Sequence, residues 1–249
     1  MATKTLGEGR EIEISARNRI VSGTLHIPPQ AQGVVVFAHG SGSGRFSPRN
    51  QYVARVLQEG GLATLLIDLL EPEESDDRQK VFDIELLAER LQAAADWLRD
   101  EPQTQHLRLG YFGASTGAGA ALVAAARAPV AVGAVVSRGG RPDLACSALA
   151  DVQAPTLLIV GGNDEVVLDL NKQALQLLRC PKELVVIPGA THLFPEPGAL
   201  EEVARLAKNH FQRYLAPARM EEYAGGRAPR SDMDPSAKVG EGGVVSGRK

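Results

Sequence analysis

"LRLGYFGASTGAGAALVAAARAP", residues 107–129, joins an apolar run to an alanine-rich run through the small residues Gly-Ala-Ser-Thr-Gly. The first run predicts a buried strand, and the second predicts a helix that Pro129 limits. A strand that passes into a helix through G-x-S-x-G is the context of a nucleophile elbow, which holds its serine, here Ser115, at a strained backbone position. Gly113 and Gly117 would let neighbouring chain pass close to this turn. The alternative interpretation is that Ser115 only caps the helix.

On both sides of this stretch, short apolar runs alternate with helical periodicity. The helical patterns are Ile84, Leu87, Leu91, Ala95 and Leu98, and later Val203, Leu206, Ala207 and Phe211. The apolar runs are "GVVVFAHG", "LATLLIDLL", "AVGAVVSRGG", "APTLLIVGG" and "ELVVIPGA". Continuous apolar runs suit parallel strands that are buried on both faces, so we predict a doubly wound, mostly parallel α/β sheet. "EIEISARNRIVSGTLHIPP" alternates polar and apolar residues, which predicts two antiparallel strands at the N-terminal edge.

The organisation of the chain favours one catalytic domain over residues 1–215. Residues 216–249 have no apolar period and many Gly, Pro and charged residues, so we expect a flexible or loosely packed tail. The segments 71–80 and 137–153, where related folds insert a lid, are too short for a large cap domain.

Composition excludes several classes of partner. The formal charge of −3, from 27 basic and 30 acidic residues, gives no field that would gather nucleic acid or an anionic membrane. No apolar run approaches the roughly 18 residues of a membrane span, and the N-terminus lacks the apolar core of a signal peptide, so we expect a cytoplasmic protein. Cys146 and Cys180 do not form a CxxC pair; we expect both to be buried, and no metal site follows from the spacing of His, Cys or Asp.

A serine nucleophile needs a base, and two of the five histidines follow strands at the edge where α/β sheets bind ligands. His39 ends "VVVFAHG", and His192 follows "ELVVIPGA". His26, His106 and His210 are more easily explained as surface or structural residues. We predict His192 as the base, although a loop residue that caps a helix is the alternative.

The base needs a carboxylate to orient it, and Asp164 leaves its strand in the turn Gly-Gly-Asn-Asp. The order Ser115, Asp164, His192 is the order that α/β-hydrolases use. Asp143 is the competing acid, since it follows the preceding strand, and a simple turn aspartate is the alternative for Asp164.

The loop "HGSGSGR" after His39 can supply donors for a developing oxyanion. We predict that the backbone N–H groups of Ser41 and Thr116 form the oxyanion hole, and that His39 and Gly40 support the loop. A phosphate-binding loop is disfavoured because neither G-x-x-x-x-G-K-[ST] nor a strict G-x-G-x-x-G occurs.

Four arginines follow strands at the same edge and are possible substrate-binding residues for an anionic group: Arg45, Arg49, Arg138 and Arg141. The simpler interpretation, which we favour, is that they pair with Glu71, Glu73, Glu74, Asp76 and Asp77.

Together, "VVVFAHGSGSGR", "GYFGASTGAGAAL", "PTLLIVGGNDEVV" and "IPGATHLF" resemble the α/β-hydrolase superfamily, in its dienelactone-hydrolase-like branch. The resemblance covers about residues 10 to 215. It implies the α/β-hydrolase fold, Ser115 as nucleophile with Asp164 and His192 as partners, and no cofactor. Dienelactone hydrolases proper carry cysteine at the elbow, so lactone hydrolysis does not carry over. The segment from "DLLEPEESDD" to "AAADWL" is also similar to hydrolase domains fused to bacterial phosphoribosyltransferases.

These residues predict a serine hydrolase that cleaves small carboxylic esters through an acyl-enzyme on Ser115. The substrate would be a small molecule, and the sequence gives no oligomeric state. An acyltransferase or lyase that uses the same triad, or a ligand-binding member of the fold without turnover, stays open.

Overall fold

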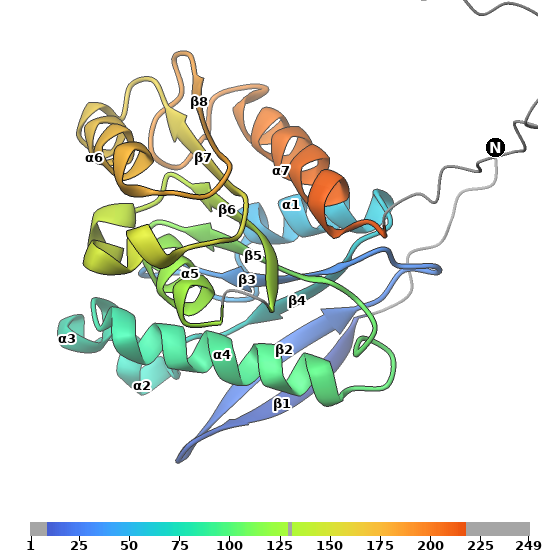
Figure 1. The fold of residues 1–249 in the computed structure, drawn as a ribbon. Coiled ribbons are helices and arrows are strands. Elements are labelled where there is room, and N and C mark those ends of the chain that lie inside the picture. The colour runs from blue at the N-terminus through green and yellow to red at the C-terminus, as the bar shows by residue number, and fades with distance from the viewer. Residues whose placement is uncertain (1–8, 129–130, 218–249) are drawn as a thin grey trace, which may run out of the picture. The chain divides into compact units, whose positions relative to one another are not determined.

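An eight-stranded sheet forms the centre of the computed structural model, which describes residues 9–128 and 131–217 (Figure 1). The strand order is β1-β2-β4-β3-β5-β6-β7-β8. The strands are β1 (Arg10–Ala16), β2 (Arg19–His26), β3 (Val34–Ala38), β4 (Ala63–Ile67), β5 (Leu109–Ala114), β6 (Val132–Arg138), β7 (Thr156–Gly161) and β8 (Lys182–Ile187).

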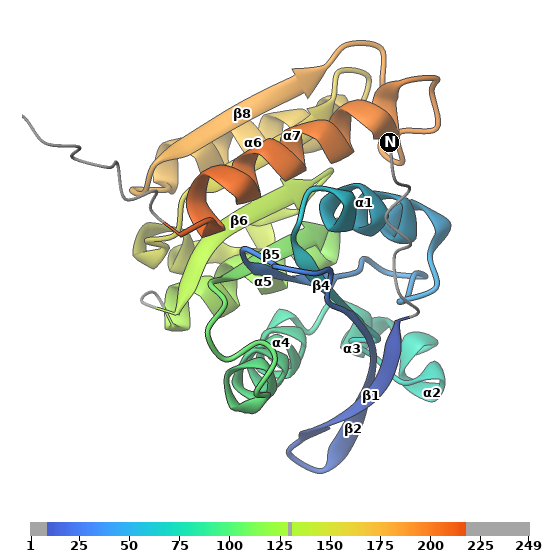
Figure 2. The ribbon, with the colours of Figure 1, turned by 90° about the vertical axis from the view of Figure 1, so that its right-hand side faces the viewer.

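The pairing of the strands confirms the predicted sheet. Every pair from β4 through β8 is parallel, whereas β2 runs antiparallel to both β1 and β4. The β1–β2 hairpin extends away from the parallel strands, as Figure 2 shows. In β3, β4, β5 and β7 every residue is buried, because helices cover both faces of the parallel part.

Helices on both faces enclose two separate apolar cores. Helices α1 and α7 cover one face, and α4, α5 and α6 cover the other (Figure 1). The helices are α1 (Pro48–Glu59), α2 (Pro72–Ser75), α3 (Arg78–Val81), α4 (Ile84–Asp100), α5 (Thr116–Arg127), α6 (Glu165–Leu177), α7 (Ala199–Leu215) and the 3-10 segment η1 (Pro142–Asp151). The short α2 and α3 stand where a lid could be inserted, so the described chain has no large cap, as predicted.

The α/β-hydrolase fold predicted from the sequence is therefore confirmed for the described residues. The predicted boundary between a domain over 1–215 and a tail over 216–249 stays a prediction, because residues from 218 onward lie outside the described part. Among the described helices, none has the length and apolar character that crossing a membrane requires.

Candidate active site

Ser115 stands in the turn between β5 and α5, with φ 49° and ψ −121°. Residues that carry a side chain rarely adopt a positive φ, so the backbone at Ser115 is strained. The surrounding contacts must hold it in this conformation. Its backbone N–H donates to the Arg138 oxygen at 3.3 Å, and its own carbonyl accepts from the N–H of Arg141 at 3.0 Å. The turn is thereby fixed to the end of β6, and Ser115 stays half-buried at the carboxyl edge of the sheet.

The glycines around Ser115 are required by close approaches of backbone. A Cβ atom on Gly113 would lie 2.4 Å from the Cα of Ala118, and one on Gly117 would lie 2.3 Å from the Ala38 oxygen. A Cβ on Gly40 would lie 2.8 Å from the Cβ of Ser115 itself. These contacts give G-x-S-x-G a mechanical reason that a plain helix cap would not need.

Asp164 and His192 meet through a hydrogen bond of 2.6 Å between Asp164 Oδ2 and His192 Nδ1. The Asp164 side chain is 16% exposed and that of His192 is 39% exposed, so the carboxylate is enclosed while the imidazole reaches solvent. Because Nδ1 faces the carboxylate, Nε2 is the ring nitrogen that is free to exchange a proton with a substrate or a serine. The competing acid, Asp143, instead accepts two hydrogen bonds from Arg141.

The loops that carry Asp164 and His192 are tied together beyond this one bond. The N–H of Asn163 donates to the Ala190 oxygen at 2.9 Å, and its side-chain amide donates to the Gly189 oxygen at 3.0 Å. Within the histidine loop itself, the N–H and hydroxyl of Thr191 both donate to Glu196. Parallel pairing of β7 with β8 brings the two loops to the same edge, and these bonds fix their relative position.

The end of β6 joins the serine turn to the histidine loop. The carbonyl oxygen of Arg138 accepts a hydrogen bond from the N–H of Ser115. A Cβ atom on the next residue, Gly139, would lie 3.5 Å from His192 Nδ1. Gly139 has φ 49°, and glycine adopts that value without strain. Ser115 and His192 therefore both lie beside the backbone of residues 138 and 139, although within the described residues no hydrogen bond joins their side chains.

His39 supports the loop predicted to hold the oxyanion. It is 6% exposed; its Nε2 accepts the N–H of Leu69 at 2.8 Å, and its Nδ1 lies 2.9 Å from the Gly40 oxygen. With Nε2 accepting, Nδ1 carries the proton and donates to Gly40. Burial lowers the pKa of His39, which keeps the ring neutral in this arrangement. Ser41 is exposed on this loop, while Thr116 opens α5, so its N–H has no acceptor within the helix.

A buried ion pair lies behind this loop, and no sequence pattern indicates its burial. Arg90 and Glu74 are 5% and 6% exposed and make hydrogen bonds of 2.6 and 3.0 Å. Arg90 also donates to the Leu69 oxygen at 2.6 Å. Since Leu69 N–H holds His39, the Glu74–Arg90 pair fixes the segment on which the oxyanion loop depends.

Glu74→Gln is expected to lower the free energy of unfolding by about 3 kcal/mol at pH 7, because it leaves the Arg90 charge buried without a partner. Hydrogen bonding to Arg90 lowers the pKa of Glu74 from 4.5 to about 2. The pair therefore stabilises the fold above pH 4.5 and is lost as the pH falls toward 2, so the difference between parent and variant should shrink over that range. Urea unfolding at several pH values measures this, with exposed Glu73→Gln as the control. Equal losses in the two variants would contradict the role given to Glu74.

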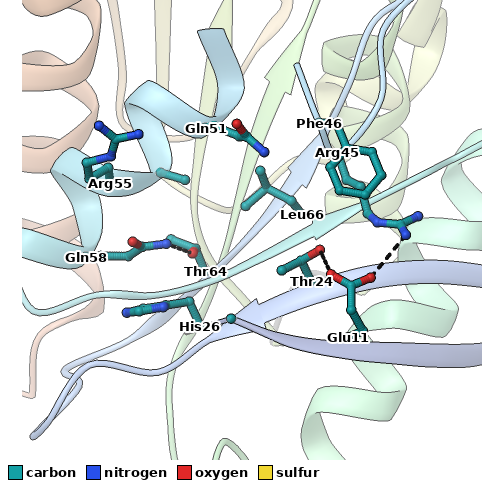
Figure 3. A pocket seen from close by; sticks show the side chains of 12 residues that line it. Glu11, Thr24, His26, Arg45, Phe46, Gln51, Arg55, Gln58, Thr64 and Leu66 are labelled. Carbon is teal, nitrogen blue, oxygen red and sulfur yellow. Dashed lines mark hydrogen bonds and ion pairs between the residues drawn. The ribbon is translucent and has the colours of Figure 1, made fainter. Parts of the chain in front are cut away.

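Of the four arginines predicted at this edge, two pair with carboxylates of the described residues and two do not. Arg141 forms a two-bond pair with Asp143 at 2.8 and 2.7 Å. Arg45 forms an ion pair with Asp68 and a second with Glu11 at 3.0 Å, beside a pocket of about 230 Å³ between α1 and strands β2 and β4 (Figure 3). No ion pair of Arg49 or Arg138 with a carboxylate occurs within residues 9–128 and 131–217.

The prediction that these arginines pair with the acids of residues 71–77 is wrong. Glu71 pairs with Arg19, and Glu74 pairs with Arg90 and Lys80. The expectation fails because α2 and α3 carry these acids toward α4 and the β1–β2 hairpin. Arg45 pairs instead with Asp68, which follows β4, and Arg141 pairs with Asp143, two residues further along the chain.

Other titratable side chains have structural roles or lie outside this edge. His210 lies 3.1 Å from the Pro155 oxygen, and His26 is buried beside α1. Cys180 is buried as expected, but Cys146 is exposed in η1, which contradicts that prediction. In the part of the chain that the structure describes, no three His, Cys, Asp or Glu side chains are grouped to hold a metal ion.

Comparison with known proteins places the chain in a family. The model of the dienelactone hydrolase family matches residues 21–217. The chain belongs to this family. A dienelactone hydrolase from Anabaena variabilis is 60% identical and has a TM-score of 0.80, over 84% of this chain and all of that one. An a/b serine hydrolase without lid from Xanthomonas campestris, 22% identical over 84% of this chain and 95% of that one, shares the fold with a TM-score of 0.67.

One similar protein is longer than this chain. A Mycobacterium tuberculosis protein named "Putative phosphoribosyl transferase" is 59% identical over 205 residues. The match covers 82% of this chain but 46% of that protein, so the chain spans about half the length of this relative. The dienelactone-hydrolase-like resemblance predicted from the sequence is thus confirmed, and membership in the family supports a hydrolase function.

Proposed function

We propose that this family member is a serine esterase that hydrolyses small carboxylic esters through an acyl-enzyme on Ser115. The observation that carries the proposal is the 2.6 Å hydrogen bond between Asp164 and His192, at the edge of the sheet where Ser115 stands on a strained turn. The three groups have the roles of nucleophile, base and orienting carboxylate. The cytoplasmic location and the small-molecule ester substrate expected from the sequence are parts of this proposal.

In the first step, the Ser115 oxygen attacks the ester carbonyl while His192 Nε2 takes the serine proton. Asp164 keeps the imidazole in position and stabilises its positive charge. The N–H groups of Ser41 and Thr116 donate to the oxyanion, and Thr116 adds the favourable end of the α5 dipole. His192 then gives its proton to the leaving alcohol.

In the second step, water replaces the alcohol. His192 removes a proton from the water, which attacks the acyl carbon, and the Ser115 oxygen leaves with that proton as the acid is released. The reaction consumes one ester and one water and yields one acid and one alcohol, with no cofactor.

We assign the acyl group to the small cavity beside the proposed oxyanion donors, and this assignment favours short acyl groups. The cavity between the 39–43 loop, Thr116 and the apolar residues Leu69, Leu70, Val81 and Leu87 has a volume of about 10 Å³. This volume holds about one water molecule. A long acyl chain would have to displace packed side chains, which weakens its binding.

We therefore expect kcat/KM to fall about ten-fold or more from 4-nitrophenyl acetate to the octanoate, because overpacking of this size costs more than about 1.4 kcal/mol. The butyrate should lie between them. Release of 4-nitrophenol by the parent protein measures all three esters. Turnover that rises toward octanoate would contradict the short-acyl site, and failure to hydrolyse any of the three would contradict the esterase proposal.

The name of the longer relative from M. tuberculosis belongs to the whole of that protein. The match covers 46% of that protein, so its name does not carry over to this chain. Transfer of phosphoribosyl groups is not part of the proposal.

A further inference from the structure

The proposed catalytic groups stand on two parts of the molecule that are held separately. Ser115 belongs to the turn between β5 and α5, whereas Asp164 and His192 follow β7 and β8 and are joined by their own hydrogen bond. Within the described residues, no hydrogen bond joins the side chains of Ser115 and His192. Proton transfer requires the nucleophile and the base to come within hydrogen-bond reach. Other contacts must therefore set the distance between the two parts.

Residues 138–141, at the end of β6, connect these two parts. The first and last residues of this segment both form hydrogen bonds with the backbone of Ser115, at 3.3 and 3.0 Å. Toward the acid side, the N–H of Gly139 donates to the Ile159 oxygen of β7 at 2.8 Å. A shift of residues 138–141 would therefore move the serine turn relative to β7 and the loop that follows it.

The side chain of Asn171 adds a second connection between this segment and the acid side. Its Nδ2 donates to the Gly140 oxygen at 3.0 Å and to the Val167 oxygen at 2.8 Å. Both neighbours are carbonyl oxygens, so the amide nitrogen must face them. Asn171 lies on α6, whose N-cap residue is Asp164, about two turns earlier. The bond therefore fixes residues 138–141 to the helix that Asp164 begins.

Stability alone does not explain an asparagine at this position. The helix α6 buries three side chains, and the other two, Val167 and Ala174, are apolar. Asn171 is 0% exposed, yet its Oδ1 has no hydrogen-bond partner among the described residues. A buried polar atom without a partner is unfavourable, and asparagine is a poor residue for a helix interior. The hydrogen bond from Nδ2 to Gly140 is what an apolar residue at this position would not supply.

Gly140 has little room in which to compensate for the loss of that bond. A Cβ atom on Gly140 would lie 1.9 Å from Ser137 Oγ and 2.6 Å from the Cβ of Ala118, because the chain packs closely between β6 and α5 here. Without Asn171, the Gly140 oxygen would be a buried acceptor that has lost its donor, which is costly. The segment would shift to reach another donor, and Ser115 would move with it.

We propose that Asn171 is a positioning residue of the esterase, which holds the Ser115 turn, through Gly140, at the distance from His192 that proton transfer requires. This inference rests on the proposed function. Asn171 transfers no proton and does not contact the substrate. It acts through the backbone of residues 138–141.

The test replaces Asn171 by leucine, which has a similar size and no donor. The kcat for 4-nitrophenyl acetate is expected to fall by about ten-fold or more, since a misplacement of about 1 Å can cost about 100-fold. KM should change much less than kcat. Labelling of Ser115 by a fluorophosphonate should slow by a similar factor, yet still reach one adduct per chain. Partial unfolding would instead lower the number of chains that become labelled.

Thr104→Val is the matched control, because it also removes a buried side-chain donor from a carbonyl oxygen. Thr104 is 1% exposed and donates to the Leu98 oxygen at 2.7 Å. It precedes β5, at the amino edge of the sheet and away from Ser115. Thermal unfolding should show a loss of stability in both variants, but Thr104→Val should keep the kcat of the parent. If Asn171→Leu fails to fold, Asn171→Ala decides the outcome.

A folded Asn171 variant with the kcat of the parent would overturn the proposal. An equal loss of kcat in Thr104→Val would also overturn it, because the loss would then follow stability and not the position of Ser115. The same holds for fewer labelled chains at an unchanged rate of labelling. A parent that hydrolyses no ester and stays unlabelled would instead overturn the esterase itself.

Discussion

Ser115→Ala is expected to reduce kcat for 4-nitrophenyl acetate by about 10⁶-fold, the loss seen when a triad enzyme loses its nucleophile. Without the serine oxygen no acyl-enzyme can form, and His192 has no serine proton to remove. The fold should be unaffected, because the Ser115 contacts in the turn are made by its backbone. Release of 4-nitrophenol by purified parent and variant, with thermal unfolding of both, measures the two effects.

The control for this variant is Ser147→Ala, which removes an exposed hydroxyl in η1. It should retain the activity of the parent. If Ser115→Ala also kept activity near the parent level, Ser115 would be only the cap of α5, and the serine esterase proposal would be wrong.

Asp164→Asn is expected to reduce kcat by about 10⁴-fold, since an amide no longer holds the imidazole in the productive tautomer or stabilises its charge. The change preserves size, so the loops tied by Asn163 and Ala190 should keep their positions. KM should change much less than kcat, because Asp164 acts on His192 and not on the substrate. Steady-state kinetics with 4-nitrophenyl acetate separates the two constants.

Asp143→Asn is the matched comparison, because Asp143 was the competing acid from the sequence. Its carboxylate pairs with Arg141, so its loss should change kcat by less than about two-fold, as expected for a surface ion pair. A large loss in the Asp143 variant together with a small loss in the Asp164 variant would reverse the assignment of the acid.

The fold could be predicted because the pattern of apolar and polar residues within each strand or helix indicates the type of that element. Continuous apolar runs become strands buried on both faces, and the alternating N-terminal stretch becomes the antiparallel β1–β2 hairpin. The turn at Ser115 could also be located, since Gly113 and Gly117 stand where backbone segments approach most closely. Chain order suggested Asp164 and His192, which the structure joins by a hydrogen bond; their catalytic roles stay predictions.

Partner choice among charged residues could not be predicted in the same way. The Glu74–Arg90 pair spans 16 residues and is buried only because α4 packs against the 69–75 segment, which no local pattern encodes. Arg138 and Arg49 looked like Arg45 and Arg141 in the sequence, and only the three-dimensional arrangement shows that, within the described residues, Arg45 and Arg141 have carboxylate partners while Arg138 and Arg49 do not. Cys146 is exposed at a kink in η1, where its φ is 47°, and no sequence pattern indicated this kink.

Covalent labelling with a fluorophosphonate tests whether Ser115 is an activated nucleophile. Intact-mass measurement of the parent should find one adduct, and peptide mapping should locate it on Ser115. The adduct should be absent in Ser115→Ala and form much more slowly in Asp164→Asn. A parent that stays unlabelled, or that is labelled at another residue, would contradict the account.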